Sequence, residues 1–256
     1  PREYNDPEDK VLVWPDLVYI EFIALLIFMA ALTVWSIVLA APLEEPANAA
    51  ATPNPSKAPW YFLGLQEMLV YFDPWIAGIV FPIFIILGMC AIPYMDINKN
   101  GDGYYSYKER RVGIFIFMYG WVALWLYLIV IGTFFRGPNW NFYGPFEWWD
   151  PHKLAVLNNV NLSEYVWVYM LGQETPNNIL IRESAGFIVV FSYLFILPIF
   201  LSQTLLKNML NAYGPVRYAS LMIFGLTMLS LPIKMFLRWT INLKYIVYIP
   251  EWFFNI

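Results

Sequence analysis

The chain is poor in the residues from which proteins build metal centres and disulfide frameworks. Its 256 residues include one cysteine, Cys90, and one histidine, His152. Cys90 lies inside an apolar run, so this chain alone cannot form a disulfide framework, a zinc site or a c-type haem attachment. His152 stands in a polar Asp-Pro-His-Lys stretch, where a solvated loop histidine is the expected state.

Charge is also scarce. Only 13% of the residues are charged, against about a quarter in soluble proteins, while 60% are hydrophobic and 20% aromatic. The net charge is -4 and the basic residues are dispersed, so nucleic acid is not expected as a partner. The first sixteen residues carry charges and no apolar core, which predicts no cleavable secretory signal. The composition indicates an integral membrane protein.

Five segments are long and apolar enough to span a bilayer as helices, which takes roughly 20 residues each. The predicted fold is therefore an all-α membrane protein with about five transmembrane helices. We expect three parts: a membrane domain over 1–135, an aromatic-rich surface segment over 136–185, and a two-helix membrane segment over 186–256. The predicted spans are 17–41, 75–94, 112–135, 186–206 and 218–236.

Basic residues in the short loops predict the orientation. The loop between the second and third spans holds Lys99, Lys108, Arg110 and Arg111, whereas the preceding loop holds only Lys57. We therefore expect a cytoplasmic N-terminus. The loop around Lys57, the stretch 136–183 and the C-terminus would then face the opposite, electropositive side.

The stretch 136–183 is too polar to span a membrane and too long for a simple turn, so we expect it to fold on the membrane surface. Residues 161–172 have the pattern of a short capped helix lying in the interface. Trp167 and Tyr169 would lie at headgroup depth within an aromatic belt.

The ten residues 58–67, Ala-Pro-Trp-Tyr-Phe-Leu-Gly-Leu-Gln-Glu, place aromatic rings and a carboxylate at the membrane edge. A membrane reaction that releases protons needs an apolar pocket, hydrogen-bond acceptors and a carboxylate that carries protons to water. Glu67 suits proton exchange near neutral pH, because an apolar setting disfavours the charged carboxylate. The alternative is that Trp60 and Tyr61 are ordinary interfacial anchors and Glu67 is solvated.

From Trp14 to Phe135, about half of the chain, the order of motifs resembles subunit IV of the cytochrome b6f complex, the counterpart of the C-terminal part of cytochrome b. The shared features are Trp-Pro-Asp-Leu at the start, a first span ending in Ala-Pro-Leu, and a Pro-rich segment before Pro-Trp-Tyr-Phe. They continue with a second span ending in Ile-Pro-Tyr-Met-Asp and a polar loop ending in Arg110 and Arg111. The resemblance implies that residues 43–74 form the quinol-site loop.

One position departs from the family. Where the family has the Glu of Pro-Glu-Trp-Tyr, this chain has Pro59. Glu67 is the nearest replacement acid, followed by Asp73. The resemblance implies that Trp60, Tyr61, Phe62 and Leu63 contact the quinol; we expect Glu67 to take the catalytic role.

The resemblance also implies cofactors and partners. Cytochrome b haems are held between paired imidazoles, so they are expected in a haem-bearing cytochrome b subunit, while this chain binds quinol and no metal. A Rieske iron-sulfur protein or a c-type cytochrome would accept electrons. The implied function is a haem-free membrane subunit of a quinol-oxidising complex in an energy-transducing membrane, with the bacterial inner membrane as the expected location.

Three further features favour plain structural roles. The run 96–107 resembles the start of a calcium-binding loop, but Tyr107 occupies the position of the required acid, so a polar turn is predicted. A second Pro-Glu-Trp, at 250–252, does not lie between the right spans, and Glu251 is expected to be solvated. Glu21 and Lys234 are expected to reach water at the membrane interface.

Two other functions stay open. In one, the chain is a structural anchor for cytochrome subunits, with a quinol site that degenerated when Pro59 replaced the acid. In the other, the five spans form part of an ion channel, which is disfavoured because the deep positions of the spans are almost uniformly apolar.

Overall fold

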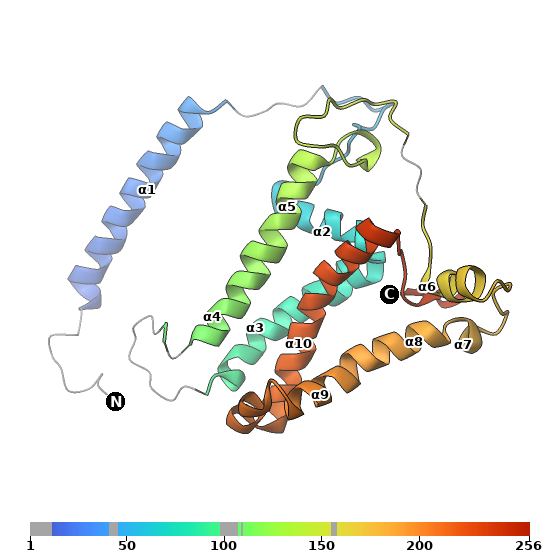
Figure 1. Ribbon diagram of the computed structural model, residues 1–256. Helices are drawn as coiled ribbons and strands as arrows, with labels where there is room; N and C mark the ends of the chain where they lie inside the picture. Colours follow the sequence, from blue (N-terminus) through green and yellow to red (C-terminus); the bar gives the residue numbers. More distant parts are fainter. Residues whose placement is uncertain (1–11, 41–45, 98–106, 109, 155–157) are drawn as a thin grey trace. The chain divides into compact units, whose positions relative to one another are not determined.

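A computed structural model describes residues 12–40, 46–97, 107–108, 110–154 and 158–256. The protein is mostly helical, and five helices are long and apolar enough to cross a membrane (Figure 1). They are Val13–Val38, Ile76–Met95, Arg111–Phe135, Ser184–Gln203 and Lys207–Ile241. The predicted all-α membrane fold with about five spans is confirmed. The predicted orientation and the three-part division stay predictions.

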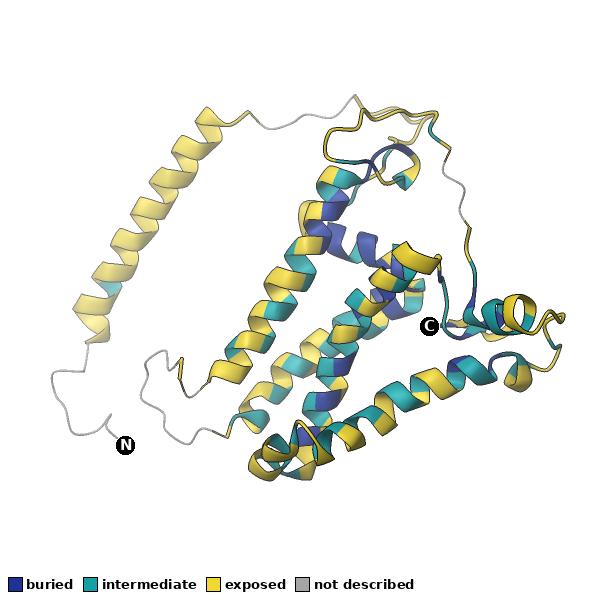
Figure 2. Cartoon of the chain, viewed as in Figure 1, coloured by how far each residue is buried: buried dark blue, intermediate teal, exposed yellow. Residues whose placement is uncertain are grey.

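The contacts divide the chain into two compact units. The first comprises Pro1–Thr52 with Asn98–Ser106, and its described helix α1 (Val18–Val38) has no buried residue (Figure 2). A helix that is apolar on all sides needs lipid or another protein around it. The second unit comprises Pro53–Ile97 and Tyr107–Ile256 and holds α2 and every described element after it.

Helix α2 (Trp60–Tyr71) precedes the second span and is too short to cross a bilayer. The second span is a wide helical turn at Ile76–Val80 followed by α3 (Phe81–Met95). The third span runs through α4 (Arg111–Met118), a wide-turn section and α5 (Tyr127–Val130), and ends at Phe135. Helix α2 crosses α5 (Figure 1).

The main core lies where α2, α5 and the second and last spans meet. Small residues permit the close packing there: a Cβ added to Gly132 would lie 3.4 Å from a methyl carbon of Leu63. The buried members of the core are Met68, Tyr71, Phe72, Ile76, Ala77, Leu128, Ile131, Leu231 and Met235. This core anchors one face of α2.

The stretch after the third span carries a tight turn at Pro138–Trp140 and a short helix that starts as α6 (Leu162–Glu164) and continues through Tyr165–Met170. The helix predicted over 161–172 is confirmed. Trp167 donates its indole N–H to the carbonyl of Arg182, at the end of α7 (Ile179–Arg182), so this ring is tied to the protein. The position of the helix in the interface stays a prediction.

The fourth span comprises α8 (Ser184–Phe191), a wide turn and α9 (Leu197–Gln203), and the fifth is α10 (Lys207–Ile241). Helix α10 is longer than predicted at both ends, with a break at Gly214, whose φ is +76°. Two tyrosine hydroxyls join the spans: Tyr193 donates to the Leu226 carbonyl at 2.7 Å, and Tyr218 to the Pro198 carbonyl at 2.8 Å.

After α10 the chain turns back on itself. Strands β1 (Tyr248–Ile249) and β2 (Phe254–Asn255) pair antiparallel around a turn at Pro250–Trp252. We call residues 243–256 the C-terminal hairpin segment. It passes so close to α8 that a Cβ on Gly186 would lie 2.2 Å from the Ile246 carbonyl oxygen. Gly186 therefore permits a close approach, though to this segment and not to another span.

Lys234 corrects one expectation. Its side chain does not reach water: the residue is 2% exposed, and its ammonium donates to the Lys244 carbonyl at 2.7 Å. The expectation failed because the C-terminal hairpin segment covers the end of α10, which the apolar pattern of the helix does not reveal.

Candidate functional site

The chain that leads into α2 is held by its own helix and by the end of the third span. Gln66 accepts a hydrogen bond from the Ala58 amide and donates one to the Ser56 carbonyl, both at 2.9 Å. Lys57 donates to the Thr133 carbonyl at 2.7 Å, and its ammonium lies 4.7 Å from the centre of a Trp149 ring. Burial lowers the pKa of Lys57. The start of α2 is thus positioned from both sides.

Pro59 stands directly before the first residue of α2, with a ψ of 148°. Its carbonyl accepts the amides of Phe62 and Leu63, at 2.8 and 3.2 Å. A proline at this place costs little, because the first helical turn leaves its amides unpaired in any case. The turn that the family builds with glutamate is therefore compatible with proline here.

Glu67 lies on the buried face of α2 and is 0% exposed. Arg136 approaches it edge-on, with Nε 2.9 Å from Oε2 and Nη2 2.7 Å from Oε1. Tyr71, one helical turn further on, donates its hydroxyl to Oε1 at 3.0 Å. The third guanidinium nitrogen, Nη1, donates to the Trp140 carbonyl at 3.0 Å. The alternative in which Glu67 is solvated is wrong.

The cluster is electrostatically matched. A two-bond guanidinium–carboxylate pair is among the strongest hydrogen-bonded contacts in proteins, and burial strengthens the attraction further. Burial, followed by the negative charge of Glu67, raises the pKa of Tyr71 well above its ordinary value. Tyr71 therefore stays protonated and remains a hydrogen-bond donor to the carboxylate.

The aromatic residues at the start of α2 face outward. Trp60, Tyr61 and Phe62 are 63%, 50% and 53% exposed, whereas Leu63 is buried. Their rings contact one another: the centroids of Trp60 and Tyr61 are 5.8 Å apart, and those of Tyr61 and Phe62 are 4.7 Å apart. Of the four residues predicted to contact quinol, three form an exposed aromatic turn, while Leu63 packs inside the protein.

Asp73 follows the other end of α2 and meets the C-terminal hairpin segment. Its Oδ1 accepts the hydroxyl of Tyr245 at 3.0 Å and the amide of Asn255 at 3.4 Å. Burial, together with the hydrogen bond to Asp73, raises the pKa of Tyr245 well above its ordinary value. The second candidate acid is thus partly exposed and held by two neutral groups.

Sequence reasoning missed the partners of both acids. Arg136 is the first residue after the third span and begins the stretch that was predicted to fold on the membrane surface. Tyr71 stands four residues after Glu67, a spacing that brings two side chains together on a helix. That spacing was a usable signal, whereas the contact of Asp73 with Tyr245 joins residues too far apart in the chain to be read from a local pattern.

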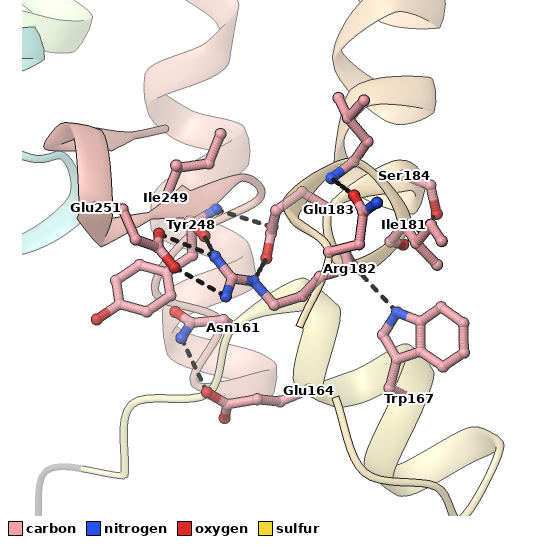
Figure 3. Close-up of polar contacts among 12 residues, drawn as sticks. Asn161, Glu164, Trp167, Ile181, Arg182, Glu183, Ser184, Tyr248, Ile249 and Glu251 are labelled. Atoms are coloured by element: carbon pink, nitrogen blue, oxygen red, sulfur yellow. Dashed lines mark hydrogen bonds and ion pairs between the residues drawn. The ribbon is translucent and has the colours of Figure 1, made fainter. Parts of the chain in front are cut away.

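A second polar cluster fixes the C-terminal hairpin segment (Figure 3). Arg182 forms two hydrogen bonds of 3.1 Å with the carboxylate of Glu251 and a third with Glu183. Glu183 is buried and accepts the amide of Tyr248 at 2.9 Å. Glu251 is exposed at its side chain, as expected, and its carboxylate is also ion-paired with Arg182, which the sequence did not predict.

Two other expected features carry no site. His152 is exposed, and among the described residues its hydrogen bond is the one from its backbone amide to the Asp150 carboxylate, at 2.8 Å. A lone exposed imidazole does not fit a haem held between two histidines. Most of the calcium-like loop, residues 98–106, lies outside the described part of the chain. Among the described residues, no group of three His, Cys, Asp or Glu could hold a metal.

Comparison with known proteins points to one family. Residues 46–145 match the family model described as cytochrome b (C-terminal)/b6/petD. The match includes α2, the second and third spans and Arg136, and it ends before the last two spans. No solved structure matches the chain. Over residues 46–145, which are less than half of the chain, the protein is therefore similar to the C-terminal part of cytochrome b of the b6 and petD type.

Proposed function

We propose that the chain completes an outer-side quinol oxidation site beside a haem-bearing cytochrome b subunit. Oxidation of one quinol releases two electrons and two protons. One electron would pass to a Rieske-type or c-type cytochrome partner, the other to the b haems of the neighbouring subunit, and both protons to the outer side. This chain's own residues would shape the pocket and move protons.

The observation that carries the proposal is the exposed aromatic turn on an anchored helix inside the family-matched segment. Trp60, Tyr61 and Phe62 offer flat apolar surfaces, while Lys57 and Gln66 hold the backbone from which they project. Quinone pockets need such apolar walls with a few polar groups. Because these rings are exposed on this chain, the opposite wall of the pocket would belong to the partner subunit.

Two carboxylates are candidates for proton transfer. Glu67 is nearest to the aromatic turn, but both of its oxygens are engaged by Arg136 and Tyr71. It would accept a proton only when Arg136 swings away. Asp73 is partly exposed and has no guanidinium among its hydrogen-bond partners in the described chain, but it stands beyond the far end of α2.

The test compares Glu67→Gln with Asp73→Asn in the intact complex, following quinol oxidation against pH. We expect Glu67→Gln to lower turnover by about 10²-fold or more, as for loss of a general base, and Asp73→Asn to matter less. Unchanged turnover of Glu67→Gln at every pH would remove Glu67 from the mechanism. Tyr71→Phe removes one hydrogen bond to Glu67 and keeps the ion pair with Arg136. This variant should change only the pH dependence of quinol oxidation. It therefore separates an effect on proton transfer from an effect on assembly of the complex.

The rival function is a structural anchor for cytochrome subunits. It is favoured by Pro59 at the position of the family acid and by the fully engaged carboxylate of Glu67. A quinone-analogue inhibitor distinguishes the two functions. Protection of Trp60 and Tyr61 from oxidative footprinting at saturating inhibitor supports the quinol site, and absence of protection supports the anchor.

A further inference from the structure

Three positive side chains gather at the C-terminal end of α10. They are Lys234, Arg238 and Lys244, and we call them the α10 basic cluster. Among the residues that the structure describes, none of the three forms an ion pair with a carboxylate. By contrast, Arg110, Arg136, Lys153 and Arg182 each have an acidic partner.

Lys234 is the innermost member. Its ammonium has one hydrogen bond, to the Lys244 carbonyl, and lies 5.4 Å from the Phe72 ring centre and 5.8 Å from that of Tyr245. Aromatic faces stabilise a cation but do not neutralise its charge. A buried positive charge therefore remains beneath Arg238 and Lys244.

Arg238 and Lys244 form the more accessible layer, since both are only half-buried. Arg238 donates to the Asn242 carbonyl at 3.0 Å and to the side-chain oxygen of Asn159 at 2.5 Å, both neutral acceptors. The Lys244 ammonium lies 5.4 Å from the Tyr245 ring centre and has no hydrogen bond to a described residue. Its donors are available to a ligand.

The charges of the cluster repel one another. Burial, followed by the charge of Arg238, lowers the pKa of Lys244, while Asp73 partly offsets the effect. Asp73 is the one nearby carboxylate of the described chain that acts on Lys244, and its Oδ1 is already shared by Tyr245 and Asn255. The cluster thus keeps an excess of positive charge.

The surroundings are those of a membrane interface. Arg238 lies in the last turn of an apolar span, and Trp239 beside it is 53% exposed. Tyr165, on the helix that follows α6, donates its hydroxyl to the Ile241 carbonyl. Aromatic residues of this kind mark headgroup depth, and clustered Lys and Arg side chains near a membrane surface attract anionic lipid headgroups by their charge.

We propose that Arg238 and Lys244 bind the phosphate group of an anionic phospholipid, with Lys234 strengthening the positive potential from below. The lipid phosphate would accept hydrogen bonds from the free donors of both side chains, and its acyl chains would lie along the apolar surface of α10.

The test uses the full chain, purified with its accompanying subunits in neutral detergent, and phosphatidylglycerol as the probe. Native mass spectrometry measures the affinity of the released chain for the lipid. We expect the Arg238→Gln, Lys244→Gln double variant to bind at least about tenfold more weakly, because each basic group near the surface contributes appreciably to attraction of anionic lipid. The matched control, Lys207→Gln with Arg217→Gln, neutralises two cations at the other end of α10 and should bind as the wild type does.

The single variant Lys244→Gln controls for misfolding of the double variant, because it leaves the hydrogen bonds of Arg238 in place. We expect its affinity for phosphatidylglycerol to be several-fold lower than that of the wild type. Equal binding by wild type and both Lys244 variants would overturn the proposal, as would equal affinity for neutral phosphatidylcholine. Inorganic phosphate is the last probe: if it displaces phosphatidylglycerol at equal phosphate concentration, a free anion and not a lipid is the natural occupant, and the lipid assignment fails.

Discussion

The pair of Glu67 and Arg136 shows how one residue contact can govern the candidate site. Both partners lose their water shell, and such a loss often cancels the Coulomb attraction. The ion pair therefore fixes the geometry of the site more than it adds to the net stability of the protein. It joins α2 to the end of the third span, which also positions the aromatic turn.

Removing one partner should destabilise the protein by far more than the net stability that the ion pair contributes. Glu67→Ala leaves a buried guanidinium uncompensated and should destabilise the protein by about 3–5 kcal/mol. The measurement is the midpoint of thermal unfolding in detergent. Glu147→Gln, in the exposed pair with Lys153, is the control and should leave the midpoint nearly unchanged. Equal midpoints for Glu67→Ala and wild type would contradict the structural role.

The contact of Glu251 with Arg182 predicts a pH response. The hydrogen bond from Arg182 holds the pKa of Glu251 below its ordinary value of 4.5. Stabilisation of the C-terminal hairpin segment is therefore fully present above that value and is lost as the pH falls through the lower pKa of the folded state.

Hydrogen exchange of the amides of residues 248–255 measures this response. The ratio of exchange rates between Glu251→Gln and wild type should exceed one at pH 6 and should approach one only as the pH falls through the lowered pKa of the Glu251 carboxylate. Comparing both proteins at the same pH removes the intrinsic pH dependence of exchange. A constant ratio would show that the ion pair does not hold the hairpin.

At the scale of elements, the C-terminal hairpin segment joins the last two spans to α2. It contacts α8 at Gly186, the acid Asp73 through Tyr245 and Asn255, and Trp75 through Phe254, with ring centres 5.3 Å apart. This short segment thus adds to the direct packing of α10 on α2 and α3, which holds the two spans outside the family match against the matched segment.

Gly186→Ala tests this junction. The new methyl group would overlap the Ile246 carbonyl, so the hairpin segment must shift, at a cost of about 1–3 kcal/mol for overpacking. Thermal unfolding in detergent reports the loss. Gly225→Ala, whose Cβ would meet no atom within 4 Å, is the matched helical control and should be neutral or slightly stabilising. Equal unfolding midpoints for the two variants would refute the close contact between Gly186 and the Ile246 carbonyl.

At the scale of the whole molecule, the chain has the character of one subunit within a larger assembly. Helix α1 has no buried residue, and many large apolar side chains of the other spans are exposed. Lipid and neighbouring subunits would cover these surfaces. Because His152 is the single histidine of this chain, we expect bis-histidine haems in a partner subunit.

Visible spectroscopy tests whether the b-type haems belong to a partner subunit. We expect the complex purified with this chain to show b-type haem bands that follow a histidine-bearing partner, and His152→Ala to leave those bands unchanged, because one exposed imidazole cannot form the ligand pair. Loss of the b bands in His152→Ala, with the subunits still assembled, would contradict this assignment.

Much of the architecture could be predicted from the sequence, because a span is a local property. Roughly 20 apolar residues in succession must form a helix in lipid, so all five spans were predictable. The short helix at 162–170 was also foreseen from its pattern. The burial of Lys234 and the engagement of Glu251 were not, since both depend on where the C-terminal hairpin segment folds.

The sequence by itself determined the membrane class, the helices and the motifs of the cytochrome b C-terminal family, since these depend on composition and on neighbours in the chain. Only the tertiary structure decided that Glu67 meets Arg136, that Asp73 meets Tyr245, and that three cations gather at the end of α10. The contacts of Glu67 and Asp73 join residues far apart in the sequence, and the packing of whole helices brings them together. The three cations are close in the sequence, but the turn of the chain after α10 brings the Lys244 backbone to Lys234.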